Sequence, residues 1–400
     1  MTLPADHTAI EAWFDASPSR EASGAYDDLK LDPIRRVLAA LPSPPRPVTV
    51  AGTKGKGSTV RFLEAILLAH GENTVAFTSP HVRDLNERWR IDGQPVDAAQ
   101  LAPACDTVAA TETATGCALT YFERCFACAC VLAADRPEAV FLCEVGLGGR
   151  LDCANALDTR LAICTHLSRD HVHILGDTLT AIAGEKLAIA RPDAPLLITN
   201  QSPAGDAAIA THQIRAATVI RVPPLPADWT LAAAGVHQRD NAAAALCAAQ
   251  RLTSLDPQRA RAALARTTLS ARCQLLQRHD GRRILVDAAH NDASLATTLD
   301  TAATLLRPGW LLLLGLARDK DAPGILAVIA ERLPAQRCHR CGYAWPRARG
   351  RDGWPEAARA WPWHKDIAAA LAALPPQQDL CISGSFYLAG EALALLEPRT

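Results

Sequence analysis

The run PVTVAGTKGKGST, residues 47–59, joins a short apolar segment to a glycine-rich loop and then to a helical pattern. Residues 47–51 predict a buried strand, and residues 58–70 predict a helix that Gly71 ends. Glycines let the backbone curl so that several N–H groups point at phosphate oxygens, and the helix N-terminus adds positive potential. The alternative is an ordinary glycine-rich turn that carries charged side chains, but the strand–loop–helix order favours a phosphate loop. The residues expected to hold a nucleotide are Gly52, Thr53, Gly55, Lys56, Gly57, Ser58 and Thr59.

The composition is that of a folded chain with nearly balanced charge. Of the 400 residues, 49% are hydrophobic and 21% are charged, which excludes disorder as the main state and predicts two or three domains. Lys plus Arg number 41 and Asp plus Glu 42, and the resulting net charge of −1 does not favour general electrostatic binding of nucleic acid. The apolar run 310–317 is far shorter than the roughly 18 residues that a membrane span needs.

The cysteines and the first residues bear on the compartment. The 13 cysteines are scattered through predicted core segments, as is typical of small apolar side chains in a reducing cytoplasm. Residues 1–7 contain no basic stretch followed by an apolar one, so we expect no signal peptide. We therefore expect a cytoplasmic protein that acts on small molecules and engages neither nucleic acid nor a membrane.

Strand and helix patterns alternate along the chain and restart after a break. Residues 139–143 and 161–165 are apolar without alternation, as in parallel strands that are covered on both faces. A strong helical pattern over 235–252 is followed by a break at 267–273, after which the alternation resumes. The sequence therefore predicts two α/β domains, residues 1–267 and 268–400. We expect residues 340–363, rich in Arg, Trp, Pro and Gly, to form a loop.

Two later segments place metal-binding side chains after predicted strands. Glu144 ends one buried strand, and His171 follows the next in Ser168-Arg169-Asp170-His171. Because the carboxyl ends of parallel strands line one crevice, Ser58, Glu144 and His171 are expected to face a common Mg²⁺ site. Glu144 could instead cap the following glycine turn, and Mg²⁺ usually prefers oxygen to a histidine nitrogen. Lys186, on a predicted helix that begins after Thr178, could be an ordinary surface lysine.

Taken together, these segments are similar to those of the folylpolyglutamate synthase and dihydrofolate synthase family of the Mur ligase superfamily. The phosphate loop resembles the family sequence Gly-Thr-Asn-Gly-Lys-Gly-Ser, with Lys54 in place of Asn. Three departures concern the loop 270–273, the run 152–155, and Ala288, which stands where the family has Gly. The further matching blocks are Ser79-Pro80-His81, Asn86-Glu87-Arg88, residues 144–152, Asp170-His171 with Leu175-Gly176, Glu185-Lys186, Gly235 to Asn241, Asp287 to Asn291, Asp319-Lys320-Asp321 and Gly384-Ser385-Phe386.

The resemblance implies both a fold and a reaction. The expected fold is α/β: a Mur-ligase-like P-loop ATPase domain with a central, mostly parallel sheet, followed by a smaller Rossmann-like α/β domain. The expected enzyme is an ATP-dependent ligase that adds L-glutamate to dihydropteroate or to reduced folates. The carboxylate would be activated as an acyl phosphate, which the glutamate amine attacks, with ADP and phosphate released. Residues 1–267 would bind ATP and the pterin, and residues 268–400 the glutamate.

The resemblance also implies a role for individual residues. Two Mg²⁺ ions would be held by Ser58, Glu144, His171 and Lys186, the lysine being carbamylated and so carboxylate-like. Lys56, Lys186 and His290 would be catalytic, although His290 could equally bind glutamate or handle a proton. The remaining expected contacts are Asn241, Arg272 and Asp287 for ATP, Phe122 and Asp152 for the pterin, Arg83 for a substrate carboxylate, and His290, Ser385 and Tyr387 for glutamate.

Several alternatives stay open at this stage. The chain could be a monofunctional folylpolyglutamate synthase, a Mur-type amino-acid ligase, an ATPase without ligation, or a degenerate ligase that only binds. Phe122 could be ordinary core packing, and Arg83 a solvated loop residue. The groups Cys338-x-x-Cys341 and Cys125-x-x-Cys128-x-Cys130 weakly suggest zinc, although the second lies in an apolar helical run. We expect a monomer.

Overall fold

The computed structural model describes residue 4, residues 6–17 and residues 30–397. Residues 1–3 and 5, on which part of the expectation about a signal peptide rests, lie outside the described residues. Among the described helices, none is long and apolar enough to cross a membrane. Contacts divide the chain into two compact units. The first contains the described residues up to His81 with Leu85–Leu231 and His237–Thr267, and the second contains Val82–Asp84, Ala232–Val236 and the described residues from Thr268 onward.

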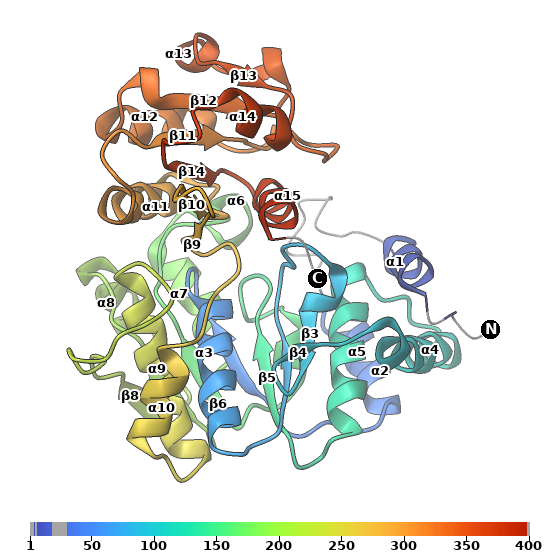
Figure 1. Ribbon diagram of the computed structural model, residues 1–400. Helices are drawn as coiled ribbons and strands as arrows, with labels where there is room; N and C mark the ends of the chain where they lie inside the picture. The colour runs from blue at the N-terminus through green and yellow to red at the C-terminus, as the bar shows by residue number, and fades with distance from the viewer. Residues whose placement is uncertain (1–3, 5, 18–29, 398–400) are drawn as a thin grey trace. The chain divides into compact units, whose positions relative to one another are not determined.

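The first unit, whose helices flank a central sheet in Figure 1, is built on eight strands in the order β4-β3-β2-β5-β1-β6-β7-β8. The six neighbouring strands β2, β5, β1, β6, β7 and β8 run parallel, and the β2–β3 and β3–β4 pairs are antiparallel. The central strands are buried along their whole length, which explains their unbroken apolar patterns. The strands are β1 Val48–Ala51, β2 Thr74–Phe77, β3 Trp89–Ile91, β4 Gln94–Pro95, β5 Val140–Glu144, β6 Leu161–Cys164, β7 Pro195–Ile198 and β8 Thr218–Arg221.

Helices cover this sheet in two groups. One group, α2, α4 and α5, packs around a core that includes Phe77, Phe126 and Phe141. The other group brings α3 together with α9 and α10. The helices are α1 His7–Asp15, α2 Asp32–Ala40, α3 Lys56–Ala69, α4 Ala98–Thr115, α5 Tyr121–Ala134, α6 Val172–Leu175, α7 Leu179–Leu187, α8 Pro203–Ala210, α9 His237–Leu252 and α10 Pro257–Leu264, with short 3₁₀ turns at Leu85–Arg88 and Cys153–Ala156.

The second unit has a six-stranded sheet with the order β13-β12-β11-β14-β10-β9. All neighbouring strands are parallel except β9, which pairs antiparallel with β10. The elements are β9 Gln274–Gln277, β10 Arg283–Val286, α11 Asp292–Leu305, β11 Leu311–Leu314, α12 Ala322–Arg332, β12 Cys338–Cys341, α13 Glu356–Arg359, β13 Trp363–His364, α14 Ile367–Ala373, β14 Leu380–Ser383 and α15 Phe386–Leu396, with 3₁₀ turns at Ala335–Arg337 and Arg351–Gly353.

The predicted α/β fold with a mostly parallel sheet is confirmed, but the expectation of a loop over 340–363 is partly wrong. Arg340 lies in β12 and is buried, and β13 and a short helix follow within the same stretch. The guanidinium of Arg340 donates hydrogen bonds to the carbonyls of Arg351, Arg359 and Trp361. A charged residue satisfied in this way fits inside a sheet, although its charge alone favours a loop.

Candidate functional site

The glycine-rich loop curls tightly between β1 and α3. Gly55 has a left-handed backbone with φ +90°, and a side chain there would collide with the Asn241 carboxamide. The loop is tied to the segment after β6, because the Thr53 and Lys54 amides donate to the His166 carbonyl at 3.0 and 3.2 Å. The structure therefore holds a loop of the shape that favours phosphate binding, with α3 beginning at Lys56, two residues earlier than the sequence predicts.

Glu144 stands directly beside this loop. It ends β5, which pairs with β1, and it is buried with 4% exposure. A Cβ added to Gly57 would lie 3.1 Å from Glu144 Oε2. The same oxygen accepts a hydrogen bond of 2.9 Å from the Ser79 amide. This proximity explains why Gly57 separates Lys56 from Ser58, because any side chain there would press on the carboxylate.

Ser79 and His81 form part of the surroundings that sequence reasoning did not place. Glu144 accepts the Ser79 amide as described, and Arg88 Nε donates to His81 Nδ1 at 3.0 Å. Burial, together with the Arg88 charge, lowers the pKa of His81 to about 4. The motif around residues 79–88 was the available signal, but its partners across the sheet are visible only in the fold.

Lys186 is a buried amine rather than a surface lysine. It lies on α7 with 5% exposure. Burial and the neighbouring Lys56 charge lower its pKa to about 7, against the charges of Asp170 and Asp152, which raise it. Lys56, Asp170 and Asp152 are thus close enough to act on Lys186 electrostatically. The Arg150 amide, in the loop after β5, donates to the Glu185 carbonyl at 2.8 Å and holds that loop against α7.

His171 is less enclosed than the other expected metal-site residues. Its backbone is left-handed with φ +49°, and it precedes α6. Its side chain is 45% exposed, with Nε2 3.9 Å from Asp170 Oδ1. The segment 168–171 does belong to this site, because Thr53 Oγ1 donates to the Ser168 carbonyl at 3.0 Å.

Asp152 lies in the turn after β5, and Phe122 of α5 packs against the same turn at Gly146. The Asp152 carboxylate accepts hydrogen bonds from the Gly146, Leu147 and Ala154 amides at 2.9–3.1 Å. Burial raises the pKa of Asp152 to about 6, although those amides and the Lys56 charge lower it. A side chain at Gly146 would collide with the Phe122 ring. The described contacts of Asp152 are therefore those of a residue that holds this turn in place, and a contact with a pterin stays a prediction.

In the second unit, Asp287, which follows β10, holds the turn before β9 that carries Arg272. Ala271 and Cys273, on either side of Arg272, have positive φ of 52° and 47°. Asp287 stabilises this strained turn, since it accepts the Cys273 amide at 2.7 Å. Ala288 has no positive φ, so its departure from Gly is accommodated. The Arg272 guanidinium lies 4.7 Å above the centre of the Phe386 ring.

His290, Ser385 and Tyr387 follow the carboxyl ends of β10 and β14. His290 Nδ1 pairs with the Ala288 carbonyl at 2.9 Å, which assigns the N–H of the neutral ring to Nδ1. Ser385 caps α15 and accepts the Tyr387 amide at 3.2 Å. The His290 and Phe386 rings lie 5.7 Å apart, so these residues occupy one edge of the second sheet.

Arg83 forms its hydrogen bonds within the second unit, to which residues 82–84 belong. Its guanidinium donates to the Leu393 carbonyl at 2.7 Å and to the Glu397 carboxylate at 2.9 Å. The residue is therefore not a solvated loop arginine, and a contact with a substrate carboxylate stays a prediction. It satisfies carbonyls at the C-terminal end of α15, where a cation is favourable.

The cysteine groups do not assemble a zinc site. Cys338 and Cys341 of β12 point into different cores on opposite faces of the sheet. Cys125, Cys128 and Cys130 are buried in α5, in the other unit. No group of three or more His, Cys, Asp or Glu side chains suited to a metal occurs among the described residues.

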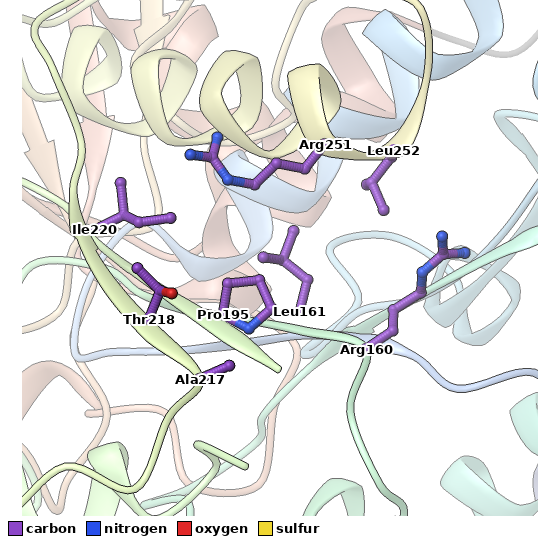
Figure 2. A pocket seen from close by; sticks show the side chains of 8 residues that line it. All are labelled: Arg160, Leu161, Pro195, Ala217, Thr218, Ile220, Arg251 and Leu252. Atoms are coloured by element: carbon purple, nitrogen blue, oxygen red, sulfur yellow. The ribbon is translucent and has the colours of Figure 1, made fainter. Parts of the chain in front are cut away.

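Two cavities of the first unit lie at the N-terminal ends of the strands, away from the phosphate loop. The larger, of about 430 Å³, lies at the start of β6, β7 and β8 (Figure 2). Arg160 and Arg251 flank an apolar floor there. The smaller, of about 250 Å³, precedes β2 and β5. Both are therefore separate from the phosphate loop, which follows the carboxyl end of β1.

Comparisons with known proteins agree with this geometry, although no protein-family model matches the chain. A dihydrofolate synthase/folylpolyglutamate synthase of Mycobacterium tuberculosis is 30% identical over 359 residues, which cover 76% of this chain and 73% of the relative. One of Escherichia coli is 29% identical over 404 residues, covering 93% and 92%. Among solved structures, M. tuberculosis folylpolyglutamate synthase complexed with ADP and AMPPCP superposes with a TM-score of 0.84, 27% identity and 98% coverage of each chain. E. coli FolC in complex with DHPP and ADP gives 0.85, 25% and 99% of each.

Proposed function

Because this chain belongs to the dihydrofolate synthase/folylpolyglutamate synthase family, we propose that the loop 52–59 binds the phosphates of ATP for glutamate ligation. The chain is an ATP-dependent ligase that adds L-glutamate to a pterin-bearing carboxylate. One observation carries the assignment of the site: the Glu144 carboxylate lies against Gly57, so a phosphate loop and a metal-binding acid meet on adjacent strands. A phosphate and its divalent cation need that juxtaposition.

The chemistry follows from the poor reactivity of a carboxylate towards an amine. The γ-phosphoryl group of ATP passes to the substrate carboxylate, ADP leaves, and an acyl phosphate forms. The glutamate amine then attacks the acyl carbon, the C–O bond to phosphate breaks, and the amine loses a proton. Lys56 neutralises charge on the transferred phosphoryl group, and the buried surroundings strengthen that interaction.

The oxygen donors of Ser58 and Glu144 fit a divalent cation. Both side chains are buried beside the loop, with exposures of 5% and 4%. Such an ion, when bound, neutralises phosphate charge in the transition state. His171 and Lys186 are proposed for a second Mg²⁺, with His171 the weaker candidate because its ring is more exposed.

Lys186 is proposed to be carbamylated. An ammonium group in its buried position would repel a cation, whereas a carbamate supplies oxygen ligands. The neutral amine attacks carbon dioxide, an N–C bond forms, and one proton passes to water. The lowered pKa of Lys186, about 7, supports this step, because a larger fraction of the amine is neutral near physiological pH.

The remaining assignments follow the same family comparison. Asn241, Arg272 and Asp287 are proposed to bind ATP, and Phe122 with Asp152 the pterin. His290, Ser385 and Tyr387 are proposed to bind glutamate, with 1–267 and 268–400 as the two functional domains. We also propose that the protein acts as a monomer in the cytoplasm.

Whether one or both synthase activities are present depends on the acceptor. The experiment measures ADP release with ATP, Mg²⁺ and glutamate, offering dihydropteroate and tetrahydrofolate separately. Activity with tetrahydrofolate alone would mean a monofunctional folylpolyglutamate synthase. ADP release that ignores glutamate would indicate an ATPase and refute ligation.

Two variants of the loop make this assay specific. Lys56→Ala is expected to abolish glutamate-dependent ADP release while the protein still folds, because the phosphoryl group loses its cation. Lys54→Asn is the matched control: it changes a lysine of the same loop to the residue usual in the family, and activity should persist. Full activity in Lys56→Ala would overturn the role proposed for Lys56.

A further inference from the structure

The segment after β12 reaches the same sheet edge as the residues proposed for glutamate. Strands β10, β11, β12 and β14 are parallel and adjacent, so their carboxyl ends meet at one edge. Ligands bind at this edge in open parallel sheets. His290 follows β10 there and Ser385 follows β14, while residues 342–349 follow β12.

An aromatic stack joins this segment to α15. The Trp345 and Tyr387 rings lie nearly parallel, 15° apart in plane, with centres 4.2 Å apart. The Arg347 guanidinium carbon lies 5.8 Å from the centre of the same Trp345 ring. Tyr387 is 45% exposed and Arg347 is exposed, so the stack presents a cation at the surface. A guanidinium held against an aromatic face is preorganised and less hydrated than one in bulk water.

A second polar group nearby lacks a partner. Tyr343 is 7% exposed, and its hydroxyl has no hydrogen-bond partner among the described residues. Burial raises the pKa of Tyr343, and the Ser385 side chain, which lies close to the hydroxyl but outside hydrogen-bond geometry, lowers it. A buried hydroxyl without a partner costs about 1–3 kcal/mol, so such a group usually awaits a ligand or water.

The backbone of the segment is firmly held. The Ala344 amide donates to the Glu391 carboxylate on α15. The Arg318 amide donates to the Arg347 carbonyl at 2.9 Å, and the Arg349 amide to the Leu316 carbonyl at 2.8 Å. Arg347 thus projects from a fixed backbone rather than from a free loop.

We propose that Arg347 binds a carboxylate of the incoming amino acid, with Trp345 as its positioning residue and the Tyr343 hydroxyl as a second donor beside Ser385. This rests on the proposed function. An amino acid with two carboxylates needs a fixed cation and directed hydroxyl donors, and this edge supplies both. Because a guanidinium also binds phosphate, the test must separate glutamate from ATP and from the pterin substrate.

The test measures KM for glutamate, ATP and tetrahydrofolate in turn by ADP release, for Arg347→Gln and the control Arg351→Gln. Arg351 is an exposed arginine that follows in the same stretch and has no place in the proposed site. Arg347→Gln should raise KM for glutamate about 10- to 100-fold, the loss expected for a hydrogen bond to a charged group. KM for ATP and tetrahydrofolate should change less than about 2-fold, and the control should match the wild type.

Further variants separate positioning from binding. Arg347→Lys should recover only part of the loss, because an ammonium group cannot form the planar two-point contact. Trp345→Leu should raise KM for glutamate with little change in kcat at saturation. Tyr343→Phe should do the same more weakly.

The outcomes distinguish failure of the Arg347 proposal from failure of the proposed glutamate ligation. Unchanged KM for glutamate in Arg347→Gln, in an enzyme whose wild type ligates glutamate, would overturn the role of Arg347 alone. A selective rise in KM for ATP or tetrahydrofolate would also overturn it, because the cation would then serve phosphate or the folate tail. A wild type without glutamate-dependent ADP release would overturn both proposals.

Discussion

Replacing Gly57 by alanine places a methyl group against the Glu144 carboxylate. The added carbon would lie 3.1 Å from Oε2 and 3.4 Å from Oε1. The first distance is tighter than ordinary packing allows, so the carboxylate must move by a few tenths of an ångström. Gly57 has no positive φ, and alanine is therefore not strained in its own backbone.

The size of the effect follows from what Glu144 holds. Its Oε2 accepts the Ser79 amide at 2.9 Å, and a hydrogen bond to a charged group contributes about 1.5–3 kcal/mol. Alanine regains up to about 1 kcal/mol through its higher helix propensity, so the net loss in folding stability should be small. If the displaced Glu144 binds the cation more weakly by the same free energy as this hydrogen bond contributes, activity at limiting Mg²⁺ should fall about 10- to 150-fold.

The assay is glutamate-dependent ADP release over a range of Mg²⁺ concentrations, with thermal melting to verify the fold. Gly57→Ala should need much more Mg²⁺ for half-maximal rate, and Glu144→Gln should be impaired more strongly. Gly350→Ala is the control, because a Cβ there meets nothing within 4 Å and the backbone φ is −71°. A well-folded Gly57→Ala protein with wild-type Mg²⁺ dependence would refute the reasoning that Glu144 serves the cation.

Three other perturbations test separate parts of the structure. Gly146→Ala should raise KM for the pterin substrate about 5- to 50-fold, because the new methyl displaces the Phe122 ring. Adding Phe122→Leu to this variant should restore part of the loss. An unchanged KM in Gly146→Ala would show that Phe122 does not contact the pterin. Lys186→Ala should lose nearly all activity and recover some with acetate or formate, which replace the carbamate oxygens; failure of any short carboxylate to rescue would count against carbamylation. For Asp379, burial raises the pKa, but hydrogen bonds from Arg307 lower it to about 2, below its unfolded value of 3.8. The pairing therefore stabilises the folded state above pH 4 and is lost as pH falls towards 2, so urea midpoints measured between pH 2 and 5 should drop in the wild type and stay flatter in Asp379→Asn.

Local patterns were enough to predict the centre of the first unit. The strands around residues 48–51, 140–144 and 161–164 are short apolar runs, and a parallel sheet covered on both faces produces such runs directly. The glycine spacing of 52–57 marks the loop, because few other residues tolerate φ of +90° at Gly55. The contact of Glu144 with Gly57 needed one further rule, that neighbouring parallel strands end at the same edge.

What the sequence could not predict depends on partners far along the chain. The hydrogen-bond acceptors of Arg83 in this structure are Leu393 and Glu397, more than 300 residues away in sequence. Arg340 suggests a loop until the carbonyls that satisfy it are seen. A local pattern records the charge of an arginine but not the acceptors that the fold brings to it.

The two units apply the same rule to different chemistry. In the first, the ends of β1 and β5 bring together a phosphate loop and a carboxylate, and the buried amine of Lys186 on α7 lies near enough to interact with Lys56; these groups suit a nucleotide and its cation. In the second, the ends of β10, β12 and β14 gather a histidine, an arginine on a tryptophan, and two hydroxyls, which suit an amino acid with carboxylates. Sequence reasoning reached β10 and β14 through family motifs, yet passed over β12 because its arginines predicted a loop. The rule that found Glu144 applies equally to Arg347, and it does so without any motif, because the order of the strands alone brings the segment after β12 to the edge where His290 and Ser385 lie.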